Sequence, residues 1–399
     1  MKVGIVSPYP RTDDPHGEEG LGGVASYAKS LVAPLRRRAD LVVLSPHDGA
    51  RSRRHDGDMM VQDVPRSGRA LADALGELGA SGVEAVHVQF EQHLYGGPAQ
   101  NLRLARALRK LRRRAGVVTT IHQVPDLDAV DRAFLKQNGF PPLPALARAW
   151  MRVQYRALVA GSDLVIVHEE RLASRLASQY GAPPARVRVV PHGVPEVADA
   201  PGADEAKARI GANGKTVLLY FGFITGYKGV DLLVGALERL PPETRQDVVV
   251  VIAGKAPERK MEKAAFRAEV ESLEARIAAL GPWVQRKGFL TPEEIRLYLA
   301  ACDVALFPYR QVFGASGPLA LALAQGRPFL LSDAFAGMGF DKRALFPRSP
   351  EGMAAKLREF LRDDRLRDAL RAHAAQLREE RLWPRVAAAT FDCYREVGA

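Results

Sequence analysis

The chain is poor in cysteine: its 399 residues include two, Cys302 and Cys393. Two distant thiols outside any metal-type spacing exclude a disulfide framework and indicate a reducing compartment. No apolar run approaches the ~18 residues that a membrane-spanning helix needs. The first residues lack the apolar segment of a signal peptide and are predicted to form a strand. We therefore expect a cytoplasmic protein, with peripheral contact at the inner membrane face as an alternative.

Aromatic residues are also few, at 7%, and none interleave with basic residues as in a nucleic-acid-binding module. The formal net charge of +11 is not confined to one tail. One predicted amphipathic helix, with leucines on its inner face, concentrates basic residues: Arg103, Arg106, Arg109, Lys110, Arg112, Arg113 and Arg114. This cluster indicates either a solvated helix face or a surface for anionic lipid or a polyanionic acceptor. No nucleic-acid partner is expected, and the oligomeric state is not predicted.

Predicted strands alternate with helices along the whole chain. One series has strands at 2–7, 41–44, 85–90, 117–121, 163–167 and 187–190, and a second has strands at 217–221, 248–253, 304–308 and after Pro328. Such alternation is typical of parallel sheets covered on both faces. The fold class is therefore α/β, with two doubly wound, Rossmann-like domains. Residues 195–214, rich in Pro, Gly, Ala and Asp, are predicted to be the linker between them.

Polar residues and glycines of the first series follow the strand ends, where parallel sheets place their chemistry. A glycine turn precedes a helix, a polar and aromatic loop follows one strand, and a histidine ends another. A second histidine lies in the turn Pro191–Val194. The candidates at these four places are Gly22 and Gly23, Glu91 and Tyr95, His122, and His192.

The second series offers a phosphate site. Ser316, Gly317 and Pro318 predict a helix N-terminus, because Ser is a preferred N-cap and Pro is tolerated in the first turn. The helix from Leu319 is apolar nearly all round, so it should be buried. A buried helix N-terminus at the end of a strand favours phosphate. Lys228, where a glycine loop turns into a helix, would add a positive charge. We expect the two domains to face each other across a cleft.

Taken in order, these segments make the chain resemble the family-four retaining glycosyltransferases over essentially its whole length. The resemblance is carried by Gly22-Gly23-Val24, His87–Glu91 with Tyr95-Gly96-Gly97, Thr119–His122, Pro191–Val194, Phe221–Asp231, Ser316-Gly317 with Gly326-Arg327-Pro328, and Trp383-Pro384 with Phe391 and Tyr394.

The resemblance implies the GT-B architecture, in which a C-terminal helix crosses back onto the first domain. The acceptor domain would be 1–198 with the crossover helix 380–399, and the donor domain would be 199–379. The implied reaction moves a hexose from a nucleotide diphosphate sugar to a hydroxyl acceptor. His122 and Lys228 would be catalytic, Glu91 and Tyr95 acceptor-side, and His192 at the domain junction. The donor would contact Gly22, Gly23, Phe223, Lys228, Lys255, Ser316, Gly317, Pro318 and Leu319.

The chain departs from the family at the donor loop. Many members carry two Glu eight positions apart, where this chain has Phe313 and Leu321, and many carry an Arg where it has Phe223. Phosphate charge would then be met by Lys228 and the helix N-terminus, with Lys255 or Arg310. Two other functions stay open: a non-catalytic relative that binds nucleotide or glycan as a partner subunit, and a nucleotide-sugar epimerase.

Asp126 and Asp128 form a D-x-D pair in the loop after His122. No third ligand is placed with them, and no other segment has metal-ligand spacing. We therefore expect no cofactor and no metal requirement.

Overall fold

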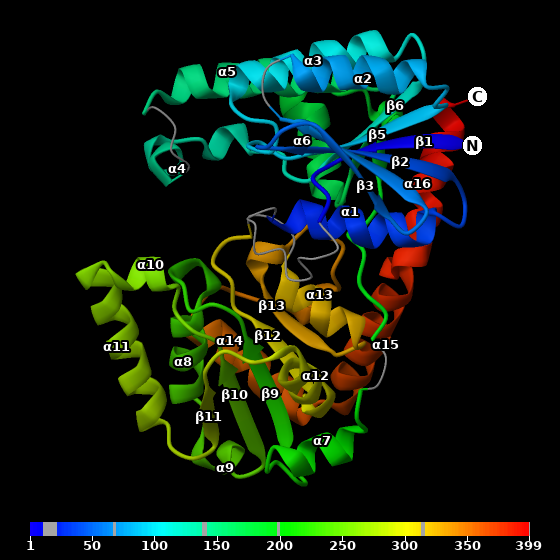
Figure 1. Cartoon of the computed structure of the whole chain (residues 1–399). Coiled ribbons are helices and arrows are strands. Elements are labelled where there is room, and N and C mark those ends of the chain that lie inside the picture. The colour runs from blue at the N-terminus through cyan, green and yellow to red at the C-terminus, as the bar shows by residue number, and fades with distance from the viewer. Residues whose placement is uncertain (11–21, 67–68, 138–141, 198–199, 313–315, 399) are drawn as a thin grey trace. The chain divides into compact units, whose positions relative to one another are not determined.

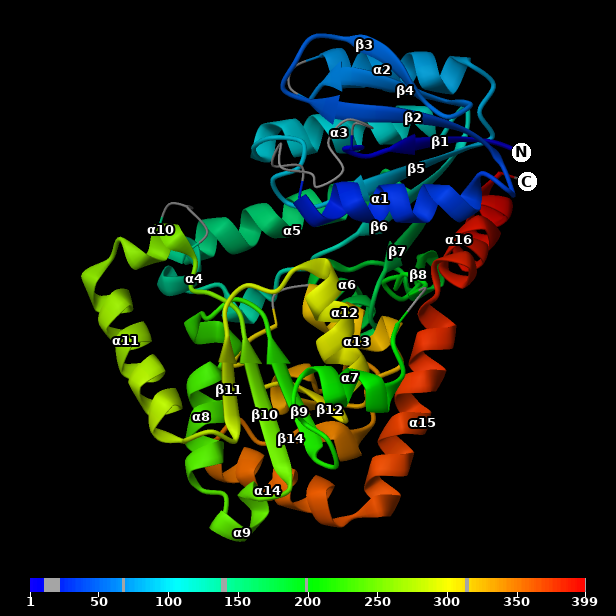
Figure 2. The ribbon, with the colours of Figure 1, turned by 60° about the horizontal axis from the view of Figure 1, so that its bottom comes forward.

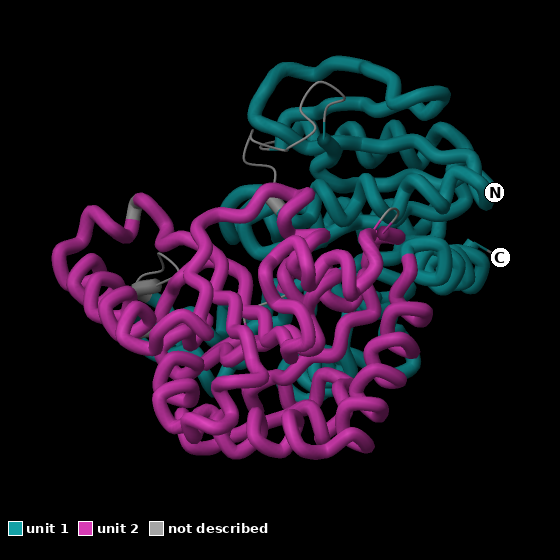
Figure 3. Tube along the Cα trace, turned by 90° about the horizontal axis from the view of Figure 1, so that it is seen from below, with its two compact units in different colours: residues 1–193, 383–399 teal, residues 194–382 magenta. Residues whose placement is uncertain are grey.

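The computed structural model describes residues 1–10, 22–66, 69–137, 142–197, 200–312 and 316–398 (Figure 1). The chain divides into two compact units, Met1–Gly193 with Trp383–Ala399 and Val194–Leu382 (Figure 3). Each has its own sheet, so the predicted α/β class with two parallel sheets is confirmed. Within the described part of the chain, no helix is both long and apolar enough to cross a bilayer.

Unit 1 has a sheet of strand order β3-β4-β2-β1-β5-β6-β7-β8, parallel except for the β3–β4 pair. Its strands are β1 (Lys2–Val6), β2 (Asp40–His47), β3 (Ser52–Asp56), β4 (Met59–Pro65), β5 (Ala85–Phe90), β6 (Gly116–Ile121), β7 (Leu164–Val167) and β8 (Val187–Val189). Its α-helices are α1 (Gly22–Leu35), α2 (Ala70–Ala80), α3 (Pro98–Leu111), α4 (Arg132–Gln137), α5 (Pro144–Ala160), α6 (Glu170–Tyr180) and α16 (Trp383–Val397).

Helices cover both faces of this sheet, which is why β5 and β7 are buried at every position. On one face, α1 and α16 pack against the strands through residues such as Leu31 and Val386. On the other, α2, α3, α5 and α6 do so through residues such as Leu75, Leu108 and Leu158.

The hairpin of β3 and β4 was absent from the predicted elements. β3 reads Ser-Arg-Arg-His-Asp and lies at the sheet edge, where its side chains are mostly exposed. Arg54 on β3 pairs with Asp63 on β4, with the guanidinium Nε 3.0 Å from the carboxylate. A charged edge strand lacks the apolar run by which the inner strands are recognised.

The helix α16 completes unit 1, which confirms the predicted crossover. The Tyr394 hydroxyl lies 2.6 Å from Nδ1 of His87 on β5. A Cβ on Gly116 would lie 2.4 Å from the Val397 carbonyl, and one on Gly193 would lie 2.4 Å from the Trp383 ring. The helix therefore packs closely at both ends, at places where only glycine leaves room.

Unit 2 has a parallel sheet of order β11-β10-β9-β12-β13-β14, of which the strands β11, β10 and β9 lie side by side in Figure 2. Its strands are β9 (Thr216–Phe221), β10 (Val248–Ala253), β11 (Val284–Lys287), β12 (Val304–Phe307), β13 (Phe329–Ser332) and β14 (Leu345–Phe346). Its α-helices are α7 (Ala203–Arg209), α8 (Val230–Glu238), α9 (Pro242–Arg245), α10 (Glu258–Met261), α11 (Ala264–Ala279), α12 (Pro292–Ala301), α13 (Gly317–Ala324), α14 (Pro350–Arg362) and α15 (Asp364–Arg381).

One prediction for unit 2 is wrong. The linker 195–214 contains α7, which packs on α12, buries Ala206 and places Lys207 2.7 Å from Asp303. Acidic residues in its first turn and basic residues in its last favour this helix despite its low apolar content. Thr291 begins α12 with a capping box, in which its side chain and that of Glu294 each accept from the other residue's backbone N–H.

Candidate functional site

The loops at the carboxyl edge of the unit 2 sheet are joined to one another. The Ile224 N–H, after β9, donates to the Lys255 carbonyl, after β10, at 3.0 Å. The Arg310 N–H, after β12, donates to the Tyr227 carbonyl at 2.7 Å. Three loops therefore form one surface at the edge where α/β sheets bind ligands.

Glycines allow these loops to approach so closely. Gly229 has φ +67°, and a Cβ there would lie 1.9 Å from the Pro308 carbonyl oxygen. Gly254 has φ +137°, and a Cβ there would lie 1.8 Å from the Gly222 carbonyl oxygen. Both positions require glycine for conformation and for space.

Lys228 lies at the end of a short 3₁₀ turn, Gly226–Lys228, and is 7% exposed. Its ammonium donates to the Tyr309 hydroxyl at 2.5 Å and lies 3.9 Å from the centre of the Tyr309 ring. The Tyr309 hydroxyl is 2.8 Å from Oγ of Ser316. Ser316 in turn caps α13, where its Oγ accepts from the Leu319 N–H at 3.4 Å. The lysine is thus connected to the positive end of a helix dipole.

No carboxylate pairs with Lys228 among the described residues, and burial lowers the pKa of its ammonium to about 8. A buried cation without a counter-ion is costly to keep charged. An anion bound beside it would restore the missing charge balance. The arrangement is therefore suited to a phosphate group.

The other predicted donor-site cations are already paired. Lys255 lies 2.8 Å from the Glu258 carboxylate, and Arg310 pairs with Asp231. Phe223 is half-exposed beyond β9, and the Pro318 ring lies 3.6 Å from where a Cβ on Gly222 would be. Leu319 is buried, as predicted for this helix. Of the two positions where relatives carry Glu, Leu321 lies on α13 and Phe313 lies outside the described residues.

A pH dependence follows from the environment of Lys228. We expect kcat/KM for the anionic ligand to fall as pH rises through about 8, because the ammonium loses its proton in the ligand-free protein. At saturating ligand the loss should move to higher pH, since a bound anion favours the charged form. Initial rates between pH 6 and 10 measure both profiles. A Lys228→Met variant should lack this step.

A second polar cluster lies inside unit 1, around His122 at the end of β6. Its Nε2 is 2.9 Å from Oε1 of Gln89 on β5. Its Nδ1 is 3.1 Å from Nε2 of His168, which follows β7. His168 Nδ1 donates to the Val190 carbonyl at 2.9 Å. Nε2 of His122 therefore donates to Gln89 and its Nδ1 faces His168, so a sugar hydroxyl that approaches either nitrogen must displace one of these side chains.

The chain of hydrogen bonds continues into the core. The Gln89 amide nitrogen is 3.1 Å from Nε2 of His87, which also lies 2.7 Å from the Thr120 hydroxyl. His87 Nδ1 meets Tyr394 of α16. Burial lowers the pKa of the His87 imidazole to about 3, and burial with the nearby His168 lowers the pKa of His122 well below its usual value. His87 and His122 are therefore neutral near pH 7.

Tyr27 of α1 holds this cluster together. Its ring centre lies 4.8 Å from that of His122, 5.2 Å from His168, 5.1 Å from His192 and 5.0 Å from Trp383. His192 Nδ1 donates to the Gly193 carbonyl at 2.8 Å. The predicted strand-end and junction histidines are thus brought together in one unit.

The sequence did not identify His168, Gln89 or Tyr27 as site residues. His168 had a usable signal, because it follows β7 just as His122 follows the neighbouring strand β6. Gln89 is a polar residue inside an otherwise apolar strand, and Tyr27 looks like any apolar-face residue of a helix.

The remaining unit 1 candidates have different surroundings. Gly22 opens α1, and Gly23 beside it is exposed. Glu91 accepts from the Gln123 amide at 2.8 Å, and burial raises the pKa of its carboxyl. Tyr95 is fully buried, and its hydroxyl donates to the Gln89 carbonyl at 2.6 Å. Tyr95 therefore supports the loop from within and offers no surface to an acceptor.

Comparisons with known proteins agree with this architecture. The structure resembles the crystal structure of Anabaena HepE in complex with UDP, with a TM-score of 0.69 at 15% identity over 99% of this chain and 100% of that one. It also resembles a UDP-forming trehalose-phosphate synthase from Burkholderia vietnamiensis, with a TM-score of 0.66 at 14% identity over 100% and 99% of the chains. The fold is that of the GT-B class of glycosyltransferases.

Two family models match the chain itself: Glycosyltransferase Family 4 over residues 21–196 and Glycosyl transferases group 1 over residues 215–363. The chain belongs to the family 4 glycosyltransferases. It is 31% identical to a D-inositol 3-phosphate glycosyltransferase of Kineococcus radiotolerans over 298 residues, which are 70% of this chain and 66% of the relative. The chain spans between about a third and two thirds of the length of the curated relatives it matches.

Proposed function

We propose that the protein moves a hexose from a nucleotide diphosphate sugar to a hydroxyl acceptor, with retention of configuration. The observation that carries this proposal is Lys228, a buried ammonium without a carboxylate partner in the described chain, connected through Tyr309 to the N-terminus of α13. Two similar proteins support this proposal. HepE, a structural neighbour, was solved in complex with UDP-glucose, and the curated sequence relative is a D-inositol 3-phosphate glycosyltransferase.

The chemistry of this site is electrostatic. The bond between the anomeric carbon and the diphosphate oxygen breaks, and a bond to the acceptor oxygen forms on the same face of the sugar as that hydroxyl passes its proton to the departing diphosphate. Lys228 and the α13 dipole stabilise the negative charge that develops on the leaving diphosphate. His122, neutral and fixed by Gln89 and His168, would orient sugar hydroxyls after exchanging one of these partners.

The test is product analysis with a panel of nucleotide sugars and hydroxyl acceptors, including inositol phosphate. Transfer gives a free nucleoside diphosphate and a glycoside whose anomeric configuration is read by NMR. An epimerase would give an altered sugar still attached to its nucleotide. A non-catalytic binding subunit would give thermal stabilisation by the nucleotide sugar and no product. Either of the last two results would reject the proposal.

We further propose that the reaction needs no metal. Asp126 is bonded by Arg175 at 3.1 Å and by the Gln179 amide at 2.8 Å, and Gln179 also donates to Asp128 at 3.2 Å. The described residues contain no cluster of three or more metal-binding side chains. Activity is therefore expected to survive dialysis against EDTA. Complete loss of activity that manganese restores would contradict this proposal and would indicate a metal site at Asp126 and Asp128.

A peripheral contact with anionic membrane at the cytoplasmic face is our proposal for the basic helix α3. Arg112 pairs with Asp163. The exposed cations around it have no carboxylate partner in the described part of the chain: Arg103, Arg106, Arg109, Lys110, Arg113 and Arg114. At and along the neighbouring α5, Leu143, Leu146 and Val153 are 55%, 64% and 52% exposed. Cations beside exposed apolar side chains suit an anionic lipid surface.

Vesicle flotation measures this contact. We expect the protein to float with vesicles containing phosphatidylglycerol and not with pure phosphatidylcholine. Arg106→Glu with Lys110→Glu should release it, while an equal charge change at Arg365 and Arg371 of α15 should not. Equal flotation of both double variants would contradict the assignment.

A further inference from the structure

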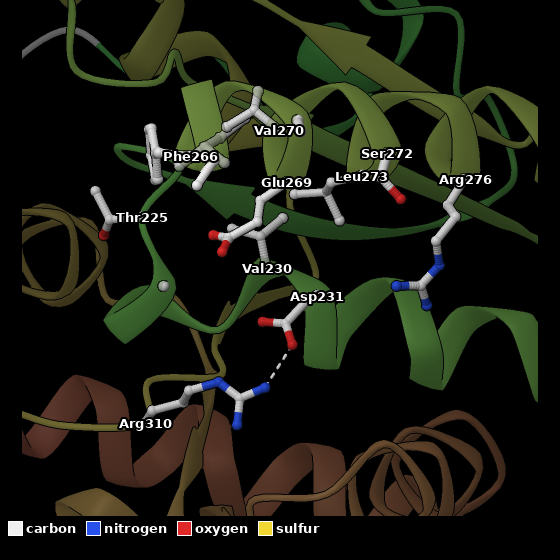
Figure 4. Close-up of a pocket in the computed structure, with 14 residues that line it drawn as sticks. Thr225, Val230, Asp231, Phe266, Glu269, Val270, Ser272, Leu273, Arg276 and Arg310 are labelled. Atoms are coloured by element: carbon white, nitrogen blue, oxygen red, sulfur yellow. Dashed lines mark hydrogen bonds and ion pairs between the residues drawn. The ribbon is translucent and has the colours of Figure 1, made fainter. Parts of the chain in front are cut away.

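Unit 2 contains a pocket that the proposed transfer reaction does not use. It lies between the N-terminal part of α8 and the helix α11 and has a volume of about 560 Å³ (Figure 4). The loop Ile224–Gly226 and Arg310 close two of its sides. Lys228, Tyr309 and Ser316, which form the candidate phosphate site, are not among its lining residues.

The floor of this pocket is apolar, and polar and charged side chains surround it. Val230 of α8 faces Phe266, Val270 and Leu273 of α11 across the space (Figure 4). An apolar floor with polar groups around it, in a pocket within the ~300–1,000 Å³ range of small-molecule sites, is typical of binding pockets for organic ligands. The apolar floor favours a ligand with an apolar body of one or two rings.

Among the charged residues that line the pocket, one carboxylate is not part of an ion pair. Arg276 makes two bonds of 2.8 Å to Glu238, and Arg310 pairs with Asp231. Glu269 of α11 is exposed at the pocket mouth and has no cationic partner among the described residues, and Figure 4 shows its side chain directed into the space between the two helices. Since both arginines are neutralised, the unbalanced charge in the pocket is negative.

We propose that this pocket binds a small organic amine, with its ammonium group beside Glu269 and its apolar body against Val230, Val270 and Leu273. A carboxylate at the mouth of an apolar pocket gives a protonated amine both a charge-assisted hydrogen bond and a surface for its hydrocarbon part. An anionic ligand would meet Glu269 and two arginines that are already occupied. The site is therefore distinct in chemistry from the phosphate site, and it stands whether or not the protein transfers a sugar.

Calorimetry and thermal shift with 2-(1-naphthyl)ethylamine test the proposal, and its alcohol, 2-(1-naphthyl)ethanol, is the uncharged counterpart. We expect saturable binding of the amine to the wild-type protein and at least tenfold weaker binding of the alcohol. Glu269→Gln should weaken amine binding by about tenfold. Glu271→Gln, an equivalent change at an exposed position of the same helix outside the pocket, should have no effect.

Two more variants keep the result interpretable. Ala265→Trp places a large ring at an exposed lining position and should abolish binding without affecting the core. Lys228→Met, which changes the phosphate site, should leave amine binding unchanged. Absence of saturable binding, equal binding of amine and alcohol, or wild-type affinity in Glu269→Gln would each overturn the proposal.

Discussion

Replacing Lys228 by methionine is expected to lower turnover by roughly 30- to 1,000-fold, which corresponds to about 2–4 kcal/mol of transition-state stabilisation. In the proposed site, this buried ammonium near the N-terminus of α13 has no carboxylate partner among the described residues, so its loss would remove a positive charge that stabilises the departing diphosphate. Methionine fills similar space and needs no solvation, so the melting temperature should not fall. Turnover at saturating donor and the melting temperature of the same preparation measure the two effects.

Lys255→Met is the matched control for this experiment. Lys255 follows β10 at the same sheet edge, but it is half-exposed and its charge is paired with Glu258. We expect less than a threefold change in turnover for this variant, because an exposed pair contributes little. Near-normal turnover of Lys228→Met would show that the diphosphate is bound elsewhere.

Gly229→Ala should be the most damaging small substitution at the same site. A Cβ at this position would meet the Pro308 carbonyl oxygen at 1.9 Å, and the residue has φ +67°. The left-handed conformation costs about 1–2 kcal/mol for alanine, and the clash forces the β9 and β12 loops apart. We expect a loss on the order of 3–5 kcal/mol in unfolding free energy, together with a large loss of turnover. Urea denaturation measures the first effect.

Gly226→Ala tests the same loop without the clash. No atom lies within 4 Å of a Cβ at Gly226, and its φ is outside the left-handed range. The variant should unfold within about 0.5 kcal/mol of the wild type. If Gly229→Ala were as stable as Gly226→Ala, the close approach of the two loops would not be a feature of the native protein.

The alternation of strands and helices was sufficient to predict both sheets, because inner strands are continuous apolar runs. In unit 2 the prediction missed the two outermost strands of the sheet, β11 and β14, which are short. Burial of β11 is incomplete, with Gln285, Arg286 and Lys287 partly exposed, so its sequence lacks an apolar signal. A two-residue strand such as β14 has no periodicity to detect.

The candidate site was predictable where chemistry is local in sequence. Ser316 as an N-cap and Lys228 beside Gly229 are signals of a few residues, and the structure joins them through Tyr309. The partners of His122 come from β5, β7 and α1, and no local pattern reports which strand ends are neighbours. Pairing of Lys255 and Arg310 with carboxylates likewise depends on side-chain positions that a sequence does not give.

The return of residues 383–397 to unit 1 sets an order of events during synthesis. His87 and Tyr394 are bonded partners separated by 307 residues, and the whole of Val194–Leu382 is translated between them. At roughly 5–20 residues per second, translation of the segment Val194–Leu382 takes on the order of ten to forty seconds. Unit 2, a continuous segment, has all its strands before α16 leaves the ribosome. Until then, the apolar side chains of β5 and β6 that α16 covers in the finished unit 1, such as Val118, are open to water and to chaperones.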